Sequence, residues 1–319
     1  MTISKNDLTE ARERIAQAET VLVVSHAKPD GDAVGSVLGI GNALINAGKQ
    51  VEMVLEDGLP ARYKFLAGSK RISRKLRGEP DLVIAVDCGS RHRFGKIDEQ
   101  IKEVDINIDH HPTNTNFGRV NLVKPTAAST TQILAEVMEY LDLEITKSIA
   151  EALLTGIITD TIGYRTISTS PDALRVSANL IDLGLDMHGI YEKAVTGKSF
   201  ISVKYWGAGL SKIQKDGEIA WTTLTESDRI ATGYSGRDDA DLVNLLSSIN
   251  EVSVIMTFIE QNAEEVKVSW RSKNGYDVSM LAEKFGGGGH FAAAGANISG
   301  TMDEVTEAVL AATQELFNN

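Results

Sequence analysis

Short apolar runs alternate with longer amphipathic segments over residues 1–160 of the chain. Runs rich in Val and Ile predict four strands, at 20–26, 51–56, 80–87 and 103–109. Segments whose apolar residues recur with a spacing near 3.6 predict helices, at 32–49, 129–143 and 146–160. Strands that are apolar throughout need cover on both faces, which the helices between them supply in parallel sheets. We therefore expect an α/β fold, with a parallel sheet that carries helices on both faces.

The second half of the chain has a different pattern. Residues 170–213 are helical in pattern, and a second α/β unit begins with an apolar strand at 218–225. That unit continues with a helix, a hairpin, another helix, a strand and a closing helix, at 239–249, 252–272, 277–286, 293–298 and 302–317. The pattern predicts a first domain at 1–190, a helical linker at 191–216 and a smaller α/β domain at 217–319.

The composition excludes several classes of protein. The chain is 42% hydrophobic and 24% charged, as in ordinary globular proteins. No apolar run reaches the roughly 18 residues of a membrane span, and the charged N-terminal segment lacks the apolar core of a signal peptide. The single cysteine, Cys88, rules out an internal disulfide framework and suits a reducing cytosol. We therefore expect a cytoplasmic protein that makes no use of a membrane.

The charge balance bears on the choice of ligand. The chain has 32 Lys and Arg against 44 Asp and Glu, a net charge of −12. Proteins that coat long nucleic acids neutralise many phosphates with basic residues, so this chain is not expected to bind them. A small phosphorylated ligand could still bind in a locally positive or metal-filled pocket.

Acidic residues and histidines cluster where the predicted elements of the first domain end. They are His26, Asp30, Asp32, Asp87, Asp109, His110, His111 and Asp160. Ligands of open parallel sheets bind outside the carboxyl ends of the strands, so these side chains could converge on one edge. Each cluster alone could be structural, as a turn, a helix N-cap or packed histidines. The four clusters together favour a metal site.

The residue types indicate which metals the site would take. Two neighbouring divalent ions need several anionic ligands, and such a pair can clamp the oxygens of a phosphoryl displacement. A mixed Asp and His set suits Mn²⁺, with Co²⁺, Fe²⁺ or Zn²⁺ as substitutes, whereas Mg²⁺ prefers oxygen ligands. Gly31 is expected to bend the loop so that Asp30 and Asp32 point the same way.

These motifs resemble those of the DHH phosphoesterase superfamily, which includes the exonuclease RecJ, manganese-dependent family II pyrophosphatases and small oligoribonucleases. "SHAKPDGDAVGS", "AVDCGS", "NIDHHPTN" and "GIITDT" look like its four motifs in order. "VSWRSKNGYDVSMLAEKFGGGGHFAAAG" looks like its DHHA1 substrate-binding domain. The chain is most similar to the bacterial nanoRNase and pAp phosphatase group. This implies a DHH catalytic domain at 1–190 and a DHHA1 domain at 217–319.

The resemblance also implies a role for each clustered residue. One Mn²⁺ would be held by His26, Asp30 and Asp87. The other would be held by Asp32, Asp87, His110 and Asp160, with Asp87 as the bridge. His111 would contact the scissile phosphate or protonate the leaving oxygen, and Asp109 would orient the histidines. The chain departs from the family at Ile162, which follows "TDT" where glycine is often found, and this could change which substrate fits.

The second domain carries a glycine run that could approach a phosphorylated ligand. Backbone without Cβ atoms can point its N–H groups at phosphate oxygens, although a flexible turn is the alternative. The predicted substrate-binding residues are Arg271, Ser272, Gly287, Gly288, Gly289 and His290. Arg271 would bind phosphate bidentately. Trp270 faces the other side of the same strand and is expected in the core.

The predicted function is the Mn²⁺-dependent, two-metal in-line hydrolysis of phosphoester bonds. Very short RNAs would be degraded to mononucleotides, and 3′-phosphoadenosine 5′-phosphate (pAp) would be converted to AMP. The nearest alternative is a phosphodiesterase for pApA or cyclic di-AMP. A family II pyrophosphatase is disfavoured by the GGGGH stretch, a RecJ-like exonuclease by the short chain, and a non-catalytic nucleotide sensor by the intact metal set. The sequence leaves open whether the protein is a homodimer.

Overall fold

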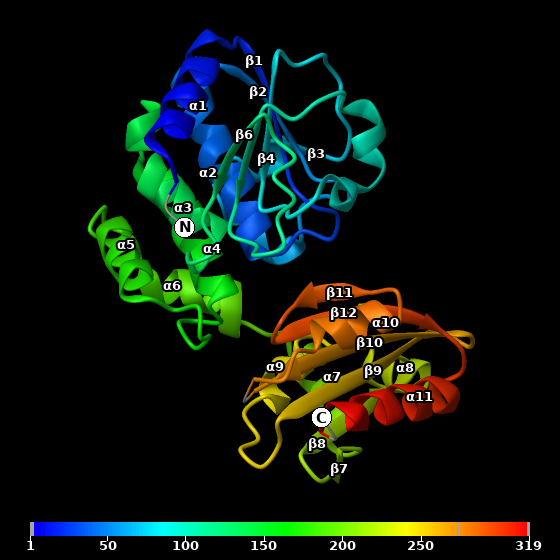
Figure 1. The fold of residues 1–319 in the computed structure, drawn as a ribbon. Coiled ribbons are helices and arrows are strands. Elements are labelled where there is room, and N and C mark those ends of the chain that lie inside the picture. The colour runs from blue at the N-terminus through cyan, green and yellow to red at the C-terminus, as the bar shows by residue number, and fades with distance from the viewer. Residues whose placement is uncertain (1–2, 274, 318–319) are drawn as a thin grey trace. The chain divides into compact units, whose positions relative to one another are not determined.

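The chain forms two compact units, Met1–Gly197 and Lys198–Asn319. The computed structural model describes residues 3–273 and 275–317 of them. In Figure 1 the first unit runs from blue to green and the second from green to red. None of the helices within the described ranges combines the length and the apolar character that crossing a membrane requires.

The first unit is built on a six-stranded sheet in which every pair of neighbours is parallel. Its strands are β1 (Thr20–Val24), β2 (Gln50–Val54), β3 (Ile72–Ser73), β4 (Leu82–Val86), β5 (Ile106–Asp109) and β6 (Val120–Val123). They lie in the order β3-β2-β1-β4-β5-β6. The expected α/β fold with a parallel sheet is confirmed. The short strands β3 and β6 were not expected, because two to four residues give too little periodicity to recognise.

Both faces of this sheet are covered, which explains why its strands are apolar at consecutive positions. In β1, Val21 and Val23 pack on one face, while Leu22 and Val24 pack on the other with Phe94. The first face carries the helices α1 (Lys5–Gln17), α2 (Gly31–Asn46), α3 (Thr130–Val137), α4 (Lys147–Asp160) and α5 (Pro171–Ile181). Phe94 belongs to η3 (Arg91–Gln100), a 3₁₀ segment that covers the second face.

The two central strands mark the point where the order of the sheet reverses. From β1 the chain moves to β2 on one side, and from β4 it moves to β5 on the other. In open parallel sheets the connections diverge at such a point and leave a crevice outside the carboxyl ends of the strands. His26 comes two residues after the end of β1 and Asp87 comes directly after β4. The topology therefore brings residues from both strand ends to this position.

Helical segments connect the first sheet to the second unit. They are α6 (Met187–Tyr191), the π-helical turn η5 (Glu192–Thr196) and α7 (Phe200–Leu210). The boundary between the two compact units falls between η5 and α7.

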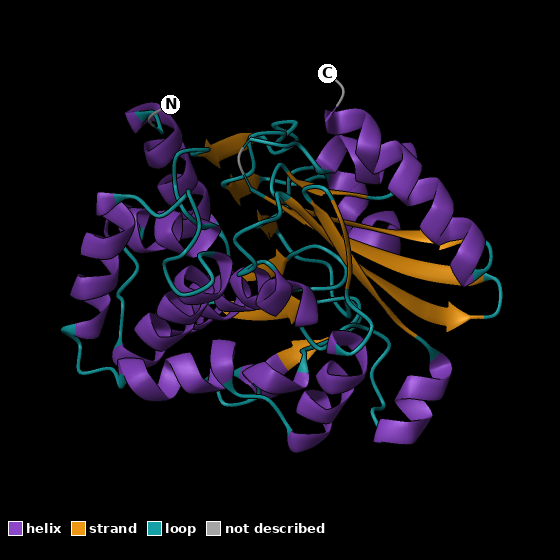
Figure 2. Cartoon of the chain, turned by 90° about the horizontal axis from the view of Figure 1, so that it is seen from below, coloured by secondary structure: helices purple, strands orange, loops and turns teal. Residues whose placement is uncertain are grey.

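The second unit contains a mixed six-stranded sheet. Its strands are β7 (Gln214–Asp216), β8 (Ile219–Leu224), β9 (Val254–Asn262), β10 (Glu265–Ser272), β11 (Gly288–His290) and β12 (Ala293–Ser299). They lie in the order β11-β12-β10-β9-β8-β7, and β8 and β9 run parallel while the other neighbours are antiparallel. The predicted hairpin at 252–272 is confirmed as β9 and β10, whose long strands are seen in Figure 2.

Helices cover both faces of the second sheet. They are α7, α8 (Glu226–Thr232), α9 (Leu242–Leu246), α10 (Ser279–Lys284) and α11 (Met302–Gln314). Trp270 is fully buried on the face that packs against α10 and α11, so its predicted place in the core is confirmed. The opposite face packs against α7 and α9, through Tyr205 and Leu242. Because side chains alternate along β10, Arg271 lies on that opposite face.

Candidate active site

Asp87 lies at the centre of the acidic and histidine residues of the first unit. It follows β4 with a left-handed backbone (φ 53°), which is uncommon for a residue with a side chain, and its carboxylate is buried. Nε2 of His26, from the segment after β1, is 3.5 Å from Oδ2 of Asp87. Nε2 of His110, from the segment after β5, is 3.8 Å from Oδ1. The two oxygens of one carboxylate therefore face histidines from two different strands.

Hydrogen bonds to backbone carbonyls fix which ring nitrogen of each histidine faces Asp87. Nδ1 of His26 is 2.8 Å from the carbonyl oxygen of Ala27, and Nδ1 of His110 is 3.4 Å from that of Ala127. A carbonyl oxygen can only accept, so each Nδ1 carries a hydrogen and donates it. Nε2 is therefore the ring nitrogen that faces the carboxylate cluster, and once it has lost its proton it can bind a metal.

The clustered residues form two groups that share Asp87. His26, Asp30 and Asp87 offer ligand atoms that all lie within 4.8 Å of one another, and so do Asp32, Asp87 and His110. Asp160, at the C-terminal end of α4, has Oδ2 3.7 Å from Nε2 of His110. The structure thus brings together the six residues that the sequence suggested as metal ligands.

Asp32 is held by the beginning of α3, a contact that the sequence did not reveal. Its Oδ2 accepts a hydrogen bond from the backbone N–H of Thr130 (2.7 Å), and its Oδ1 accepts from the backbone and hydroxyl of Thr131 (3.0 and 2.6 Å). The hydroxyl of Thr130 also donates to Oδ1 of Asp87 (3.1 Å). These threonines lie almost a hundred positions from Asp32, so no local pattern connects them. The two threonines orient the carboxylates of Asp32 and Asp87 through these hydrogen bonds.

The pKa values of the cluster reflect burial and the close spacing of its charges. Burial, followed by the charges of neighbouring carboxylates, raises the pKa of both Asp32 and Asp160. Burial also acts to raise the pKa of Asp87. The hydrogen bond and the charge of His26 outweigh burial there and hold the pKa of Asp87 well below its usual range. Burial lowers the pKa of His26, yet the hydrogen bond to Asp87 and the charge of Asp30 outweigh it and bring that pKa to about 9. Buried carboxylates beside two imidazole rings fit divalent cations, which would take the place of the protons that the cluster binds without them.

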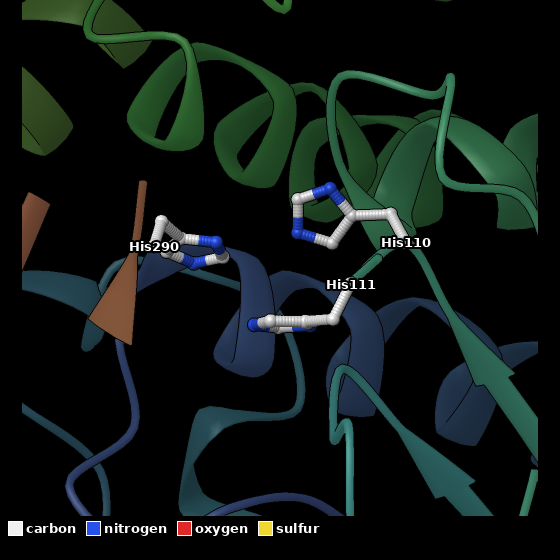
Figure 3. A group of neighbouring side chains, drawn as sticks. All are labelled: His110, His111 and His290. Atoms are coloured by element: carbon white, nitrogen blue, oxygen red, sulfur yellow. The ribbon is translucent and has the colours of Figure 1, made fainter. Parts of the chain in front are cut away.

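His111 is held differently from the two other histidines. Its Nδ1 bonds Oδ1 of the fully buried Asp109 (2.7 Å), and Oδ2 of Asp109 accepts from the side chain of Asn114 (2.6 Å). Its Nε2 lies 3.3 Å from Nη1 of Arg93 on η3. Figure 3 shows the rings of His110 and His111, which both follow the end of β5. Asp109 therefore orients His111, while His110 bonds a backbone carbonyl instead.

One expectation about the first motif is wrong. Gly31 does not bend a loop between Asp30 and Asp32, because it is the first residue of α2, the helix that was predicted to begin at residue 32. Asp30 is the N-cap of this helix, and its Oδ1 accepts from the backbone N–H groups of Asp32 and Ala33, both at 3.0 Å. Gly31 is required for a different reason, since a Cβ there would lie only 2.1 Å from Oγ1 of Thr159 on α4.

The predicted substrate-binding residues of the second unit lie near the junction of β10, β11 and β12. Nε of Arg271 donates to the side chain of Asn244 on α9 (2.9 Å), and Nη1 donates to the carbonyl of Trp270 (2.9 Å). The hydroxyl of Ser272 donates to the carbonyl of Tyr276 (2.6 Å). Gly288, Gly289 and His290 form the short strand β11, paired with β12, and Gly287 precedes it. Two of the four successive glycines, Gly288 and Gly289, are therefore ordered by pairing.

Comparison with known proteins places the chain in a family. Residues 20–157 match the DHH family, N-terminal domain, and residues 228–319 match the DHHA1 domain. The bifunctional oligoribonuclease and PAP phosphatase NrnA of Thermus thermophilus is 34% identical over 92% of this chain and 89% of its own. The chain belongs to the DHH family. The resemblance seen in the sequence is confirmed, and this DHH-family protein is an enzyme that hydrolyses phosphoester bonds.

Two further proteins extend the comparison of this DHH-family chain. The crystal structure of an exopolyphosphatase-related protein from Bacteroides fragilis superposes with a TM-score of 0.91, at 27% identity and 99% coverage of both chains. The cyclic-di-AMP phosphodiesterase GdpP of Geobacillus thermodenitrificans is 23% identical over 96% of this chain and 49% of its own. The α/β architecture is thus found in the Bacteroides fragilis protein as well.

Proposed function

We propose that this enzyme degrades very short oligoribonucleotides to mononucleotides and dephosphorylates pAp, with Mn²⁺ as cofactor. The observation that carries the proposal is Asp87, whose two carboxylate oxygens face histidines from two different strands. That arrangement suits a bridging ligand between two cations. The similarity to the Thermus NrnA over most of both chains supports the choice of substrates.

The metal ligands follow from the two groups around Asp87. His26, Asp30 and Asp87 would hold one ion, and Asp32, Asp87, His110 and Asp160 would hold the other. The mixed nitrogen and oxygen set suits Mn²⁺, with Co²⁺, Fe²⁺, Zn²⁺ or Mg²⁺ as substitutes. When bound, such a pair of ions stabilises charge on a phosphoryl group and activates water.

Other residues of the chain would bind and orient the substrate. His111 would contact the scissile phosphate or protonate the leaving oxygen, and the buried Asp109 at its Nδ1 would orient its ring. In the second unit, the proposed substrate-binding residues are Arg271, Ser272, Gly287, Gly288, Gly289 and His290. They would bind the phosphate or base that is remote from the chemistry.

The proposal is tested by activity on 5′-labelled di- to pentanucleotides and on pAp with Mn²⁺. Replacing the bridging ligand in Asp87→Ala is expected to lower kcat/KM by about 1,000-fold or more, because the remaining ligands no longer join the two ions. Asp172→Ala, at an exposed carboxylate on α5, is the matched control and should leave the rate unchanged. Wild-type rates for Asp87→Ala, or no hydrolysis of any of these substrates by the wild type, would contradict the proposal.

A second candidate is a phosphodiesterase for pApA or cyclic di-AMP. The similarity to the GdpP of Geobacillus thermodenitrificans favours it, because that protein is named as a cyclic-di-AMP phosphodiesterase. Turnover of cyclic di-AMP and pApA, compared with mixed dinucleotides and pAp, separates the two candidates. The second replaces the first if the adenine substrates are cleaved at least about 100-fold faster than the others.

The proposed partners are therefore short RNA oligonucleotides and phosphorylated adenine nucleotides. A net charge of −12 disfavours long nucleic acids, in which many phosphates must be neutralised at once. The single cysteine supports a cytoplasmic setting.

A further inference from the structure

Arg93 is a cationic residue that lies beside the site. It is not one of the proposed metal ligands, so its function needs a separate explanation. It lies on η3, the 3₁₀ segment that follows β4 and Asp87. Its Nη1 is 3.3 Å from Nε2 of His111. A guanidinium has no acceptor, so Arg93 is the donor in this contact.

The backbone of Arg93 is anchored to the loop that carries His26. Its carbonyl oxygen accepts a hydrogen bond from the N–H of Ala27 (2.8 Å), which is the residue directly after His26. Burial is the largest single influence on the pKa of both His26 and Cys88, and the positive charge of Arg93 also acts on both groups, in the direction that lowers their pKa. The residue is therefore held in place between the segments that follow β1, β4 and β5.

The guanidinium of Arg93 is half-buried yet has no carboxylate partner. No ion pair joins it to an Asp or Glu within residues 3–273 and 275–317. Arg91, two residues earlier, shows the contrast, because it bonds the carboxylate of Asp98 and the carbonyls of Ile101 and Lys102. A partly desolvated cation is costly unless an anion compensates it. In Arg93 a single side-chain hydrogen bond uses one of five donors.

We propose that Arg93 is a substrate-binding residue that donates hydrogen bonds to a non-bridging oxygen of the scissile phosphate, while it also positions the ring of His111. The inference rests on the proposed function, since a phosphoester must bind at the Asp87 cluster. A phosphate is the anion that this arrangement fits, because arginine matches its oxygens with two parallel donors. The carboxylates of the cluster would otherwise repel an anionic substrate, and Arg93 offsets part of that repulsion.

The test compares Arg93→Met and Arg93→Lys with the wild type. Methionine keeps the apolar stem of the side chain and removes the charge and the donors. We expect kcat/KM for pAp and for a dinucleotide to fall by about 10- to 100-fold in Arg93→Met, the effect of one charge-assisted hydrogen bond. Lysine should restore part of the loss. Lys96→Met, at an exposed position on the same segment, is the matched control and should keep the wild-type rate.

A binding measurement separates substrate contact from a purely structural role. AMP, the expected product, is titrated calorimetrically into the Mn²⁺-loaded proteins. Its affinity should fall by about 10-fold or more in Arg93→Met, while the affinity for Mn²⁺ stays at the wild-type value because Arg93 is not a metal ligand. Guanidinium ion, added far below denaturing concentrations, should partly restore the activity of Arg93→Ala.

The outcomes distinguish this inference from the proposed function. Unchanged AMP affinity in Arg93→Met, or unchanged kcat/KM, would overturn the phosphate contact and leave the proposed function standing. A loss of Mn²⁺ affinity equal to the loss of activity would also overturn it, since Arg93 would then act through the metal site. A wild type that hydrolyses none of the nucleotides would overturn the proposed function, and the inference with it.

Discussion

Replacing Gly31 with alanine should damage both the stability and the chemistry of the first unit. Gly31 is the first residue of α2 and stands between Asp30 and Asp32. A Cβ at this position would lie 2.1 Å from Oγ1, 2.6 Å from Cβ and 2.7 Å from Cγ2 of Thr159. A different rotamer of Thr159 cannot relieve the overlap, because its Cβ is itself too close. The two helices must therefore separate by roughly 1 Å to reach ordinary van der Waals contact.

The expected size of the effect follows from this overlap. Forcing an extra methyl group into a packed core costs about 1–3 kcal/mol, and removing a glycine from a helix returns about 0.5–1 kcal/mol. The net loss of about 1–2 kcal/mol corresponds to a Tm lower by about 2–8 °C for a unit of this size. Because Asp160 follows Thr159, the shift also moves it away from Asp30 and Asp32. A displacement of about 1 Å at reacting groups can cost about 100-fold in rate.

The assay combines thermal unfolding of the metal-free protein with kcat/KM for pAp in Mn²⁺. Gly207→Ala is the matched control, because Gly207 is also helical and a Cβ there would meet no atom within 4 Å. It should leave activity unchanged and Tm unchanged or slightly higher. A Gly31→Ala protein with the Tm and activity of the wild type would refute the close approach of α2 and α4. A lower Tm with full activity would refute the link between that approach and the placement of Asp160.

Two further predictions concern metal loading and the buried thiol. Mn²⁺ at 100 times its Kd should stabilise the folded protein by about 2.7 kcal/mol and raise its Tm by about 5–10 °C. The Asp87→Asn substitution should abolish this increase in Tm. The same Tm with Mn²⁺ and with a chelator would argue against the metal site. Burial raises the pKa of the Cys88 thiol to about 12 from 9.0, so the thiol stays protonated as pH rises from 7 to 9.5. Alkylation of the native protein should accordingly stay slow across that range and become fast once the chain is unfolded. Rapid alkylation of the native protein at pH 9 would show that the thiol is accessible.

Local pattern was enough to predict the fold class and the residues that gather at the site. Strands that are apolar on both faces predicted a parallel sheet, because such strands are buried only when other elements cover both faces of the sheet. The carboxyl ends of parallel strands share one edge, so polar residues after β1, β4 and β5 had to lie near one another. This is why His26, Asp87 and His110 could be grouped before any distance was known.

Local pattern also left errors where neighbouring elements pack. The glycine between Asp30 and Asp32 was expected to bend a loop. The structure instead begins α2 there, because Asp30 caps the helix and Gly31 allows α4 to approach. The segment η3, which carries Arg93, has no periodic pattern that would have identified it.

The amino-acid sequence by itself determined the α/β class, the strand ends and the identity of the acidic and histidine clusters, because these depend on spacing along the chain. The tertiary structure decided which oxygen of Asp87 faces which histidine, that the beginning of α3 holds Asp32, and that Arg93 contacts His111. Such contacts join residues that are distant in sequence. They depend on the packing of whole helices against a sheet, and the spacing of residues along one chain does not encode that packing in a local pattern.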